Sequence, residues 1–390
     1  MVSPLADAVT TKPSRFQRLV LPGFAFKAVV IGGGYATGRE LAEYFMPSGP
    51  WGGLAGMLLA TAIWSVLCVT TFLFARSTAS QDYRTFFANL LGPFAVLFEL
   101  LYFLFVVFIL AVFGAAAGAI GAALFDWPKL YGTLCLMAGI VYCTTFGNLS
   151  VERLFKGVSI LLYVTYALFM ILALTKFGGK IMSSFMAAHA PHQWAAGGIT
   201  YAAYNVIGAI VILPVTRHMQ SSRDALLAGL LAGPLAMLPA LAFFVCMCAF
   251  YPQIADQPLP SDYMLQQMGL PVFHIAFQVM IFAALLESGT GSVHAINERI
   301  ARAYRGTGTL RELPNSARLA IAALVLIVSI FIADRFGLVT LIAKGYRMLA
   351  LATLVLYVSP LMTYGVWRLW KGRALKLAKT KPSPSLLEIP

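Results

Sequence analysis

Charged residues are scarce in this 390-residue chain: they make up 11% of it, whereas hydrophobic residues make up 60%. A water-soluble domain has no means of burying so much apolar surface, so the composition indicates a multi-pass membrane protein. The five cysteines all fall within apolar segments, and their spacing matches neither a disulfide framework nor a zinc motif. A Walker phosphate-binding sequence is also missing, which argues against a nucleotide-driven pump. A cleavable secretory signal is not expected, because the first apolar segment follows a polar, basic stretch.

Apolar runs of about 20 residues predict membrane-spanning helices. We place ten of them at residues 22–46, 51–75, 92–122, 128–146, 154–176, 195–216, 225–250, 272–297, 317–334 and 339–369. They form two groups of five, residues 22–178 and 195–370, separated by an external loop at 179–194. Because each group has an odd number of spans, the second group enters the membrane in the opposite sense. The expected fold is therefore all-α, with two inverted repeats of five helices.

Most Lys and Arg residues fall on one side of these spans, which sets the orientation because cytoplasmic loops retain positive charge. Both termini are predicted to be cytoplasmic: an N-terminal tail at 1–21 and a basic tail at 371–390. The expected location is a bacterial-type cytoplasmic (inner) membrane. Topology and attraction to anionic membrane lipids explain the net charge of +13, so no nucleic-acid partner is inferred.

The first span contains Gly32-Gly33-Gly34 at its centre and three charged residues, Arg39, Glu40 and Glu43, in its second half. Each glycine weakens a helix by roughly 1 kcal/mol relative to alanine. An ionised side chain at bilayer depth costs about 2.5 kcal/mol or more. Both features favour a helix that unwinds at the glycines and lines a water-accessible cavity. The alternative is that these glycines serve only close helix packing.

The sixth span opens the second group and is also rich in glycine and polar residues, from Gly197-Gly198 to Tyr204-Asn205. Interrupted helices at corresponding positions of two inverted repeats indicate a binding site near the membrane midplane. Tyr201 and Tyr204 can present a wall or a cation–π face to an amine. Close packing is again the alternative interpretation.

Five motifs stand out along the chain: Gly32–Glu40, Tyr204-Asn205, Glu287–Gly291, Asn297-Glu298-Arg299 and Lys344-Gly345-Tyr346. They resemble the YkvI-like membrane proteins, which we place in the amino acid–polyamine–organocation superfamily with its LeuT-type fold of 5+5 inverted repeats and discontinuous helices 1 and 6. The resemblance covers nearly all of residues 22–370. It says little about the substrate.

The resemblance implies a secondary active transporter, a symporter that moves an amino acid or an amine by alternating access coupled to sodium or protons, with no other cofactor and no enzymatic activity. The implied substrate-binding residues are Gly32, Gly33, Gly34, Tyr35, Ala36, Thr37, Gly38, Tyr201, Tyr204 and Asn205. The implied sodium site comprises Ile31, Gly33, Glu287 and Ser288. Arg39, Glu40 and Glu43 are expected to form a gate, although Arg39 and Glu43 at i,i+4 also suit an internal ion pair.

Ion or proton coupling is assigned to the eighth span, at Glu287, Ser288, Thr290 and His294. Glu287 lies near the middle of an apolar run, where it suits a sodium ligand, a proton carrier or the counter-charge of an amine. It also suits a fixed structural pair with Lys27 or Arg39. By approximate alignment, Glu287 replaces a hydroxyl of the LeuT-type sodium site, so simple sodium coordination is in doubt.

Three further interpretations stay open. An uncoupled facilitator or channel would use the same cavity, and a membrane-embedded enzyme would need more catalytic groups than Glu287 and His294. His189 and His192 in the external loop can supply two ligands to a metal ion, but the sequence places no further ligand beside them. Glu99 in the third span is expected to snorkel or to pair with Arg84.

Overall fold

The computed structural model describes residues 13–31, 33–146, 149–188, 193–305 and 314–371, and no strand occurs among them. The helices of the first half are α1 (Arg15–Leu19), α2 (Leu21–Val30), α3 (Gly33–Ala36), α4 (Arg39–Tyr44), α5 (Gly49–Ser77), α6 (Tyr83–Leu91), α7 (Ala95–Phe125), α8 (Lys129–Phe146) and α9 (Leu149–Ala187). Those of the second half are α10 (Trp194–Asn205), α11 (Gly208–Val211), the 3₁₀ helix η3 (Leu213–His218), α12 (Ser222–Met247), α13 (Pro260–Met268), α14 (Pro271–Arg305), α15 (Asn315–Thr340) and α16 (Tyr346–Thr353).

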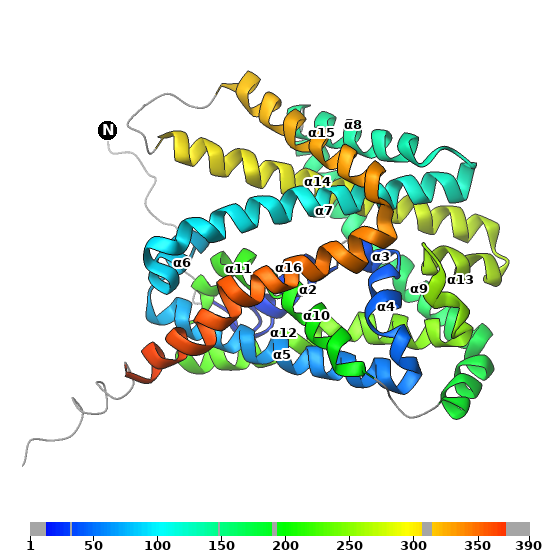
Figure 1. Ribbon diagram of the computed structural model, residues 1–390, viewed down its shortest axis with the longest axis horizontal. Coiled ribbons are helices and arrows are strands. Elements are labelled where there is room, and N and C mark those ends of the chain that lie inside the picture. Colours follow the sequence, from blue (N-terminus) through cyan, green and yellow to red (C-terminus); the bar gives the residue numbers. More distant parts are fainter. Residues whose placement is uncertain (1–12, 32, 147–148, 189–192, 306–313, 372–390) are drawn as a thin grey trace, which may run out of the picture.

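The long helices pack as two groups (Figure 1). One group, in the upper part of the view, contains α7, α8, α14 and α15. The other, in the lower part, contains α2, α5, α10 and α12, so helices from both halves of the sequence mix in each group. The short helices α3 and α4 lie where the groups meet, because α3 contacts α7 and α14 while α4 contacts α10.

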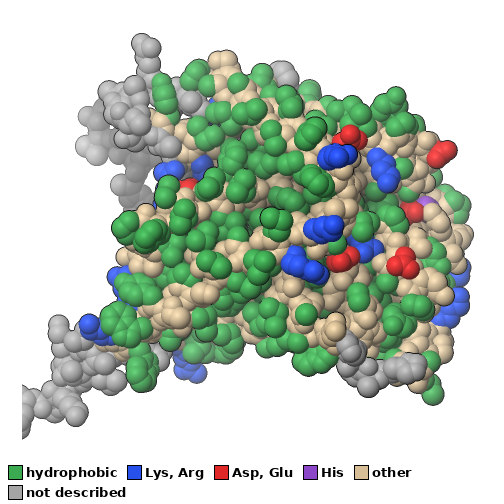
Figure 2. Space-filling model, viewed as in Figure 1, with side chains coloured by type: hydrophobic (Ala, Val, Ile, Leu, Met, Phe, Trp, Pro, Cys, Tyr) green, Lys and Arg blue, Asp and Glu red, His purple; other side chains and the backbone are tan. Residues whose placement is uncertain are grey.

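Seven helical stretches of the described residues are long and apolar enough to cross a membrane. They are Arg39–Ser77, Tyr83–Phe125, Leu161–Ala187, Trp194–Val211, Ser222–Phe250, Pro271–Ala301 and Ser316–Lys371. Figure 2 shows a wide apolar area on the visible face, with charged side chains gathered toward two opposite sides. This distribution fits a body embedded in lipid, and the expected all-α multi-pass membrane fold is confirmed.

Several predicted boundaries differ from the observed helices. The chain at 179–187 is helical and extends α9, whereas we expected a loop from 179. Phe177 and Ile181 are buried there, and their packing outweighs the weak helix propensity of Gly178 and Gly179. The expected ninth and tenth spans form one stretch that bends at Gly337, whose φ is 68° and ψ 166°. The expected first span divides into α2, α3 and α4.

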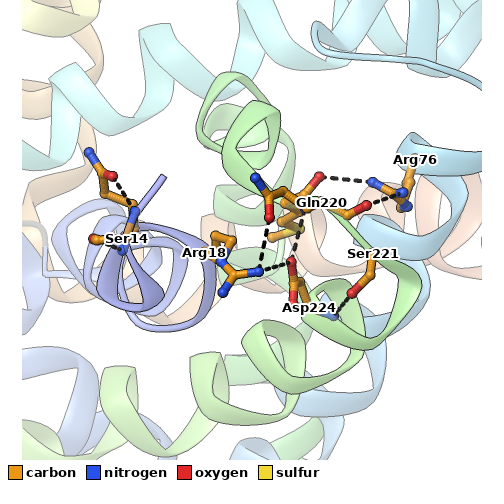
Figure 3. Close-up of polar contacts among 8 residues, drawn as sticks. Ser14, Arg18, Arg76, Gln220, Ser221 and Asp224 are labelled. Atoms are coloured by element: carbon orange, nitrogen blue, oxygen red, sulfur yellow. Dashed lines mark hydrogen bonds and ion pairs between the residues drawn. The ribbon is translucent and has the colours of Figure 1, made fainter. Parts of the chain in front are cut away.

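The predicted N-terminal tail contains α1, which begins with a capping box between Ser14 and Gln17. Figure 3 shows how this helix is tied to the start of α12. Nη1 of Arg18 donates to Oε1 of Gln220 at 3.1 Å and lies 3.4 Å from Oδ2 of Asp224. Arg76, at the end of α5, donates to the Gln220 carbonyl at 2.5 Å. The ends of α1, α5 and α12 are therefore held as one unit.

We expect Asp224→Ala to lower the midpoint of thermal unfolding in detergent. Asp224 also accepts the backbone N–H of Gln220 at 2.9 Å, so the variant leaves that amide and Arg18 without this acceptor. Each lost charged hydrogen bond of this kind is worth about 1–3 kcal/mol. The control is Asp334→Ala, which removes an exposed carboxylate and is expected to leave the midpoint unchanged. Equal midpoints for the two variants would contradict the tie.

Candidate functional site

The first span is broken between α2 and α4, as the glycines predict. Ile31 leaves the helical region with φ −74° and ψ 78°, and Gly38 has φ 79°. Gly33 and Gly34 lie in the four-residue helix α3. Gly32 lies outside the described residues. A Cβ on Gly38 would stand 2.6 Å from the ring of Phe243, so both its backbone angle and its surroundings require glycine.

The backbone groups freed by this break are satisfied by distant elements. The Tyr166 hydroxyl on α9 donates to the Ala36 carbonyl at 2.6 Å. The Ser261 amide on α13 donates to the Thr37 carbonyl at 3.0 Å. The Gly38 amide closes a turn onto the Tyr35 carbonyl at 2.9 Å. An interrupted helix is stable within a bilayer only when its polar groups find such partners.

The interruption of the sixth span is milder. Val206 and Ile207 separate α10 from α11 but keep right-handed helical angles. The chain tightens there into i→i+3 bonds, such as the Ala209 amide to the Val206 carbonyl at 2.9 Å. The Asn205 side chain donates to the Tyr201 carbonyl at 3.2 Å. The predicted discontinuity is thus a change of helix type rather than an open, unwound segment.

Close packing also explains the glycines at the start of α10. A Cβ on Gly197 would lie 1.8 Å from the carbonyl oxygen of Tyr44, and one on Gly198 would lie 2.5 Å from that of Gly56. These two glycines therefore let α10 approach α4 and α5 at backbone distance. The alternative interpretation of glycine as a packing residue holds at both positions.

A buried carboxylate surrounded by tyrosines lies where α4 meets α10. We call this set the tyrosine cage; it consists of Glu40 with Tyr35, Tyr44, Tyr201, Tyr204 and Tyr346. Glu40 is 2% exposed, and its Oε2 accepts the Tyr204 hydroxyl at 2.6 Å. Tyr346 contacts the same carboxyl group and stacks on Tyr204 with ring centroids 4.3 Å apart.

Several polar groups of the cage are not used within the described structure. Among the described residues, none of the Lys or Arg side chains forms an ion pair with Glu40. The hydroxyls of Tyr35 and Tyr201 are buried without a hydrogen-bond partner in this part of the chain. A buried carboxylate without a counter-charge is costly, so such a group favours a bound proton or cation.

The sequence anticipated only part of this cage. Tyr35, Tyr201 and Tyr204 were expected at a binding site, whereas Glu40 was expected in a gate and lies inside the cage. Tyr44 and Tyr346 were not assigned to it. The available signals were the i,i+4 spacing of Glu40 and Tyr44 on one face of α4 and the position of Tyr346 in one of the motifs.

Beside the cage, Arg39 joins the first span to the loop that precedes α13. Nη1 of Arg39 donates to the carbonyls of Ala255 and Gln257 at 2.7 and 2.9 Å. Its Nη2 lies 2.6 Å from Oε2 of Glu43, which confirms the predicted i,i+4 ion pair. The Tyr44 hydroxyl donates to the Ile342 carbonyl at 2.6 Å. These contacts join the first span, the loop before α13 and the segment before α16.

Glu287 lies half-buried on α14. A fixed pair with Lys27 or Arg39 is not among the ion pairs of the described residues. The Lys27 ammonium lies over the Tyr163 ring, 4.3 Å from the centroid, and Arg39 binds the backbone of the loop before α13. Tyr163 also lies within electrostatic range of Glu287, so both Lys27 and Glu287 lie near this ring.

The remaining predicted coupling residues lie on the same helix. Ser288 accepts the Ser292 hydroxyl at its carbonyl at 2.8 Å, and the Thr290 hydroxyl donates to the Leu286 carbonyl at 2.7 Å. His294 is exposed. The described residues contain no group of three or more His, Cys, Asp or Glu side chains that could hold a metal. His189 and His192 lie outside the described residues.

Comparisons with known proteins agree with this geometry. No protein-family model matches the chain. It is similar to YkvI of Bacillus subtilis (strain 168), described as an uncharacterized membrane protein, at 22% identity over 289 residues, 71% of this chain and 79% of that protein. The solved structure of a Na⁺-coupled sialic acid symporter in a substrate-bound outward-open state superposes with a TM-score of 0.58 at 14% identity, covering 91% of this chain and 82% of the symporter.

MhsT in complex with L-phenylalanine also gives a TM-score of 0.58, at 15% identity over 92% of this chain and 97% of MhsT. The chain has the LeuT-type fold. A mutant form of the manganese transporter of Eremococcus coleocola superposes with a TM-score of 0.53 at 15% identity, covering 92% of this chain and 81% of that protein. The LeuT-type fold accounts for the two groups of helices and the broken first span, and the expected likeness to YkvI is confirmed.

Proposed function

We propose that this chain is a secondary active transporter that moves a small organic solute, an amino acid or an amine, across the cytoplasmic membrane by alternating access. The observation that carries the proposal is Glu40, a carboxylate with no cationic partner in the described residues, buried in the tyrosine cage beside a broken helix. The LeuT-type fold, and neighbours described as a Na⁺-coupled symporter and a manganese transporter, support transport over catalysis.

In this proposal Glu40 and the aromatic faces of the cage receive the positively charged end of the solute. Carboxylates and tyrosine rings both attract an ammonium group, and desolvation strengthens both attractions. The free hydroxyls of Tyr35 and Tyr201 supply hydrogen bonds to its polar groups. Gly33 to Gly38 and Asn205 form the surrounding backbone.

Arg39 and Glu43 act as the outer gate in this scheme. Arg39, paired with Glu43, closes the outer side by binding the loop before α13, whereas the inner helix α2 leaves Phe24 and Val29 40% and 38% exposed. We assign the observed arrangement to a state closed to the outside. The orientation with both termini in the cytoplasm follows from the distribution of Lys and Arg.

The test combines binding and flux. Purified protein is screened by thermal shift against amino acids and amines, with and without sodium across a range of pH, because a bound solute stabilises the folded form. Hits are then examined for counterflow of labelled solute in proteoliposomes. Counterflow supports a carrier. Solute movement without counterflow indicates an open channel and rejects the proposal, and counterflow without any ion-driven accumulation indicates an uncoupled facilitator and also rejects it.

Coupling is assigned to Glu287, with Ser288, Thr290 and His294 on the same helix and sodium or a proton as the ion. We expect Glu287→Gln to reduce ion-driven uptake about tenfold or more, since the amide neither carries a proton nor neutralises a cation. Solute binding by thermal shift is expected to persist because the cage is unchanged. Uptake that keeps its full rate and its dependence on pH and sodium would remove Glu287 from the coupling mechanism.

A further inference from the structure

A second unusual charged group lies far from the cage, at the end of α14. The guanidinium carbon of Arg299 lies 3.2 Å from the ring centroid of Tyr102 on α7 and 3.7 Å from that of Tyr83 on α6. The two rings are nearly parallel, with centroids 6.0 Å apart and planes 11° apart. The guanidinium is therefore held between them, and cation–π attraction on both faces fixes its orientation.

Because a tyrosine ring covers each face of this guanidinium, only its N–H edge can contact a ligand. Among the described residues, Arg299 has neither a carboxylate partner nor a hydrogen-bond acceptor. The N–H groups along the edge of a guanidinium form a planar fork that matches two oxygens of a phosphate. Arg299 is thus oriented for an anion that the described part of the chain does not supply.

The nearby Glu99 carboxylate lies within electrostatic range of Arg299, but its ion pair among the described residues is with Arg84. Oε1 of Glu99 accepts from Nε of Arg84 at 3.1 Å, and Oε2 accepts the Tyr83 hydroxyl at 3.1 Å. This confirms the predicted pairing of Glu99 with Arg84. Two arginines and one carboxylate leave the cluster with a net positive charge, and the carboxylate is already engaged.

The space beside Arg299 is partly apolar. A cavity of about 200 Å³ is bounded by three charged residues, Arg84, Glu99 and Arg299, and by Tyr102, Phe103, Ile296 and Ile300. It continues onto the exposed apolar surface of α7, where Phe103 is 40% exposed. Leu100 and Leu104 flank it there, 58% and 52% exposed. A soluble anion would leave these apolar walls uncovered, whereas an amphiphile would cover them.

We propose that this cavity binds an anionic phospholipid, with the headgroup phosphate on the edge of Arg299 and near Arg84, and an acyl chain along Phe103, Ile296 and Ile300. Basic pockets between spanning helices at the cytoplasmic surface suit anionic headgroups. The site is separate from the tyrosine cage and does not depend on what the protein transports.

The test uses delipidated full-length protein in detergent, titrated with phosphatidylglycerol or phosphatidylcholine and read by native mass spectrometry. Wild type is expected to bind phosphatidylglycerol about tenfold more tightly than phosphatidylcholine. Arg299→Gln is expected to lose that preference. Arg223→Gln, which removes an exposed charge near the start of α12, is the matched control and is expected to keep it.

Should Arg299→Gln fail to purify, Arg84→Gln provides the second variant, because Arg84 is 46% exposed and its loss also frees the Glu99 carboxylate. The proposal is overturned if each of these variants that can be purified, Arg299→Gln or Arg84→Gln, keeps the same preference for phosphatidylglycerol as Arg223→Gln. It is also overturned if inorganic phosphate stabilises the wild type against heating as much as phosphatidylglycerol does. That outcome would identify a site for soluble anions.

Discussion

Glu40→Gln is expected to raise the solute concentration needed for half-maximal uptake about 10- to 100-fold while the protein remains folded. The amide oxygen still accepts the Tyr204 hydroxyl, so the packing of the cage is retained. What disappears is the negative charge, and a hydrogen bond to a charged group is worth about 1.5–3 kcal/mol, or tenfold for each 1.4 kcal/mol. The measurement is uptake of labelled solute into proteoliposomes, together with thermal unfolding.

Two comparisons sharpen this experiment. Tyr204→Phe removes one donor to the carboxylate but keeps the ring stacked on Tyr346, so its effect is expected to be smaller than that of Glu40→Gln. Asp126→Asn removes an exposed carboxylate after α7 and is expected to behave as wild type. If Glu40→Gln retains wild-type apparent affinity, the carboxylate does not contact the solute and the cage is a structural element.

Gly197→Ala is expected to destabilise the protein and to impair uptake together. The added Cβ would lie 1.8 Å from the carbonyl oxygen of Tyr44, which cannot move aside as a flexible side chain would. Overpacking of this kind typically costs about 1–3 kcal/mol. The separation it forces between α4 and α10 also moves the Tyr44 ring away from the rings of Tyr201 and Tyr204, which it contacts at centroid distances of 6.2 and 5.8 Å.

The matched control is Gly179→Ala in α9. A Cβ there meets nothing within 4 Å, and alanine favours a helix by up to about 1 kcal/mol, so unchanged or slightly raised stability is expected. The measurements are the midpoint of thermal unfolding and the rate of uptake. Wild-type values for Gly197→Ala in both assays would show that the close approach of α10 to α4 is dispensable.

The sequence predicted features whose causes are local. Three glycines beside charged residues indicated a break in the first span, and the break lies there because glycine propensity and buried charge act within a few residues. The ion pair of Arg39 with Glu43 followed from helical spacing in the same way. The all-helical, multi-pass character of the fold was accessible from hydropathy alone.

Other parts of the site depend on residues far apart in the chain, and no local pattern revealed them. Tyr166 reaches Ala36 across 130 positions, and the partner of the Arg39 guanidinium is the backbone of a loop 216 positions away. Backbone carbonyls of that loop carry no sequence signature. The interruption of the sixth span was overestimated because Gly197, Gly198 and Asn205 were read as signs of unwinding, whereas the two glycines serve close packing and the chain at Val206 keeps helical angles.

The bond from the Ser261 amide to the Thr37 carbonyl has a mechanical consequence. The bond ties the broken first span to α13, so in the proposed transport cycle a movement of α13 away from the first span has to break it. A hydrogen-bond donor of the entering solute would then replace the Ser261 amide at this carbonyl, which keeps the backbone oxygen paired within the bilayer.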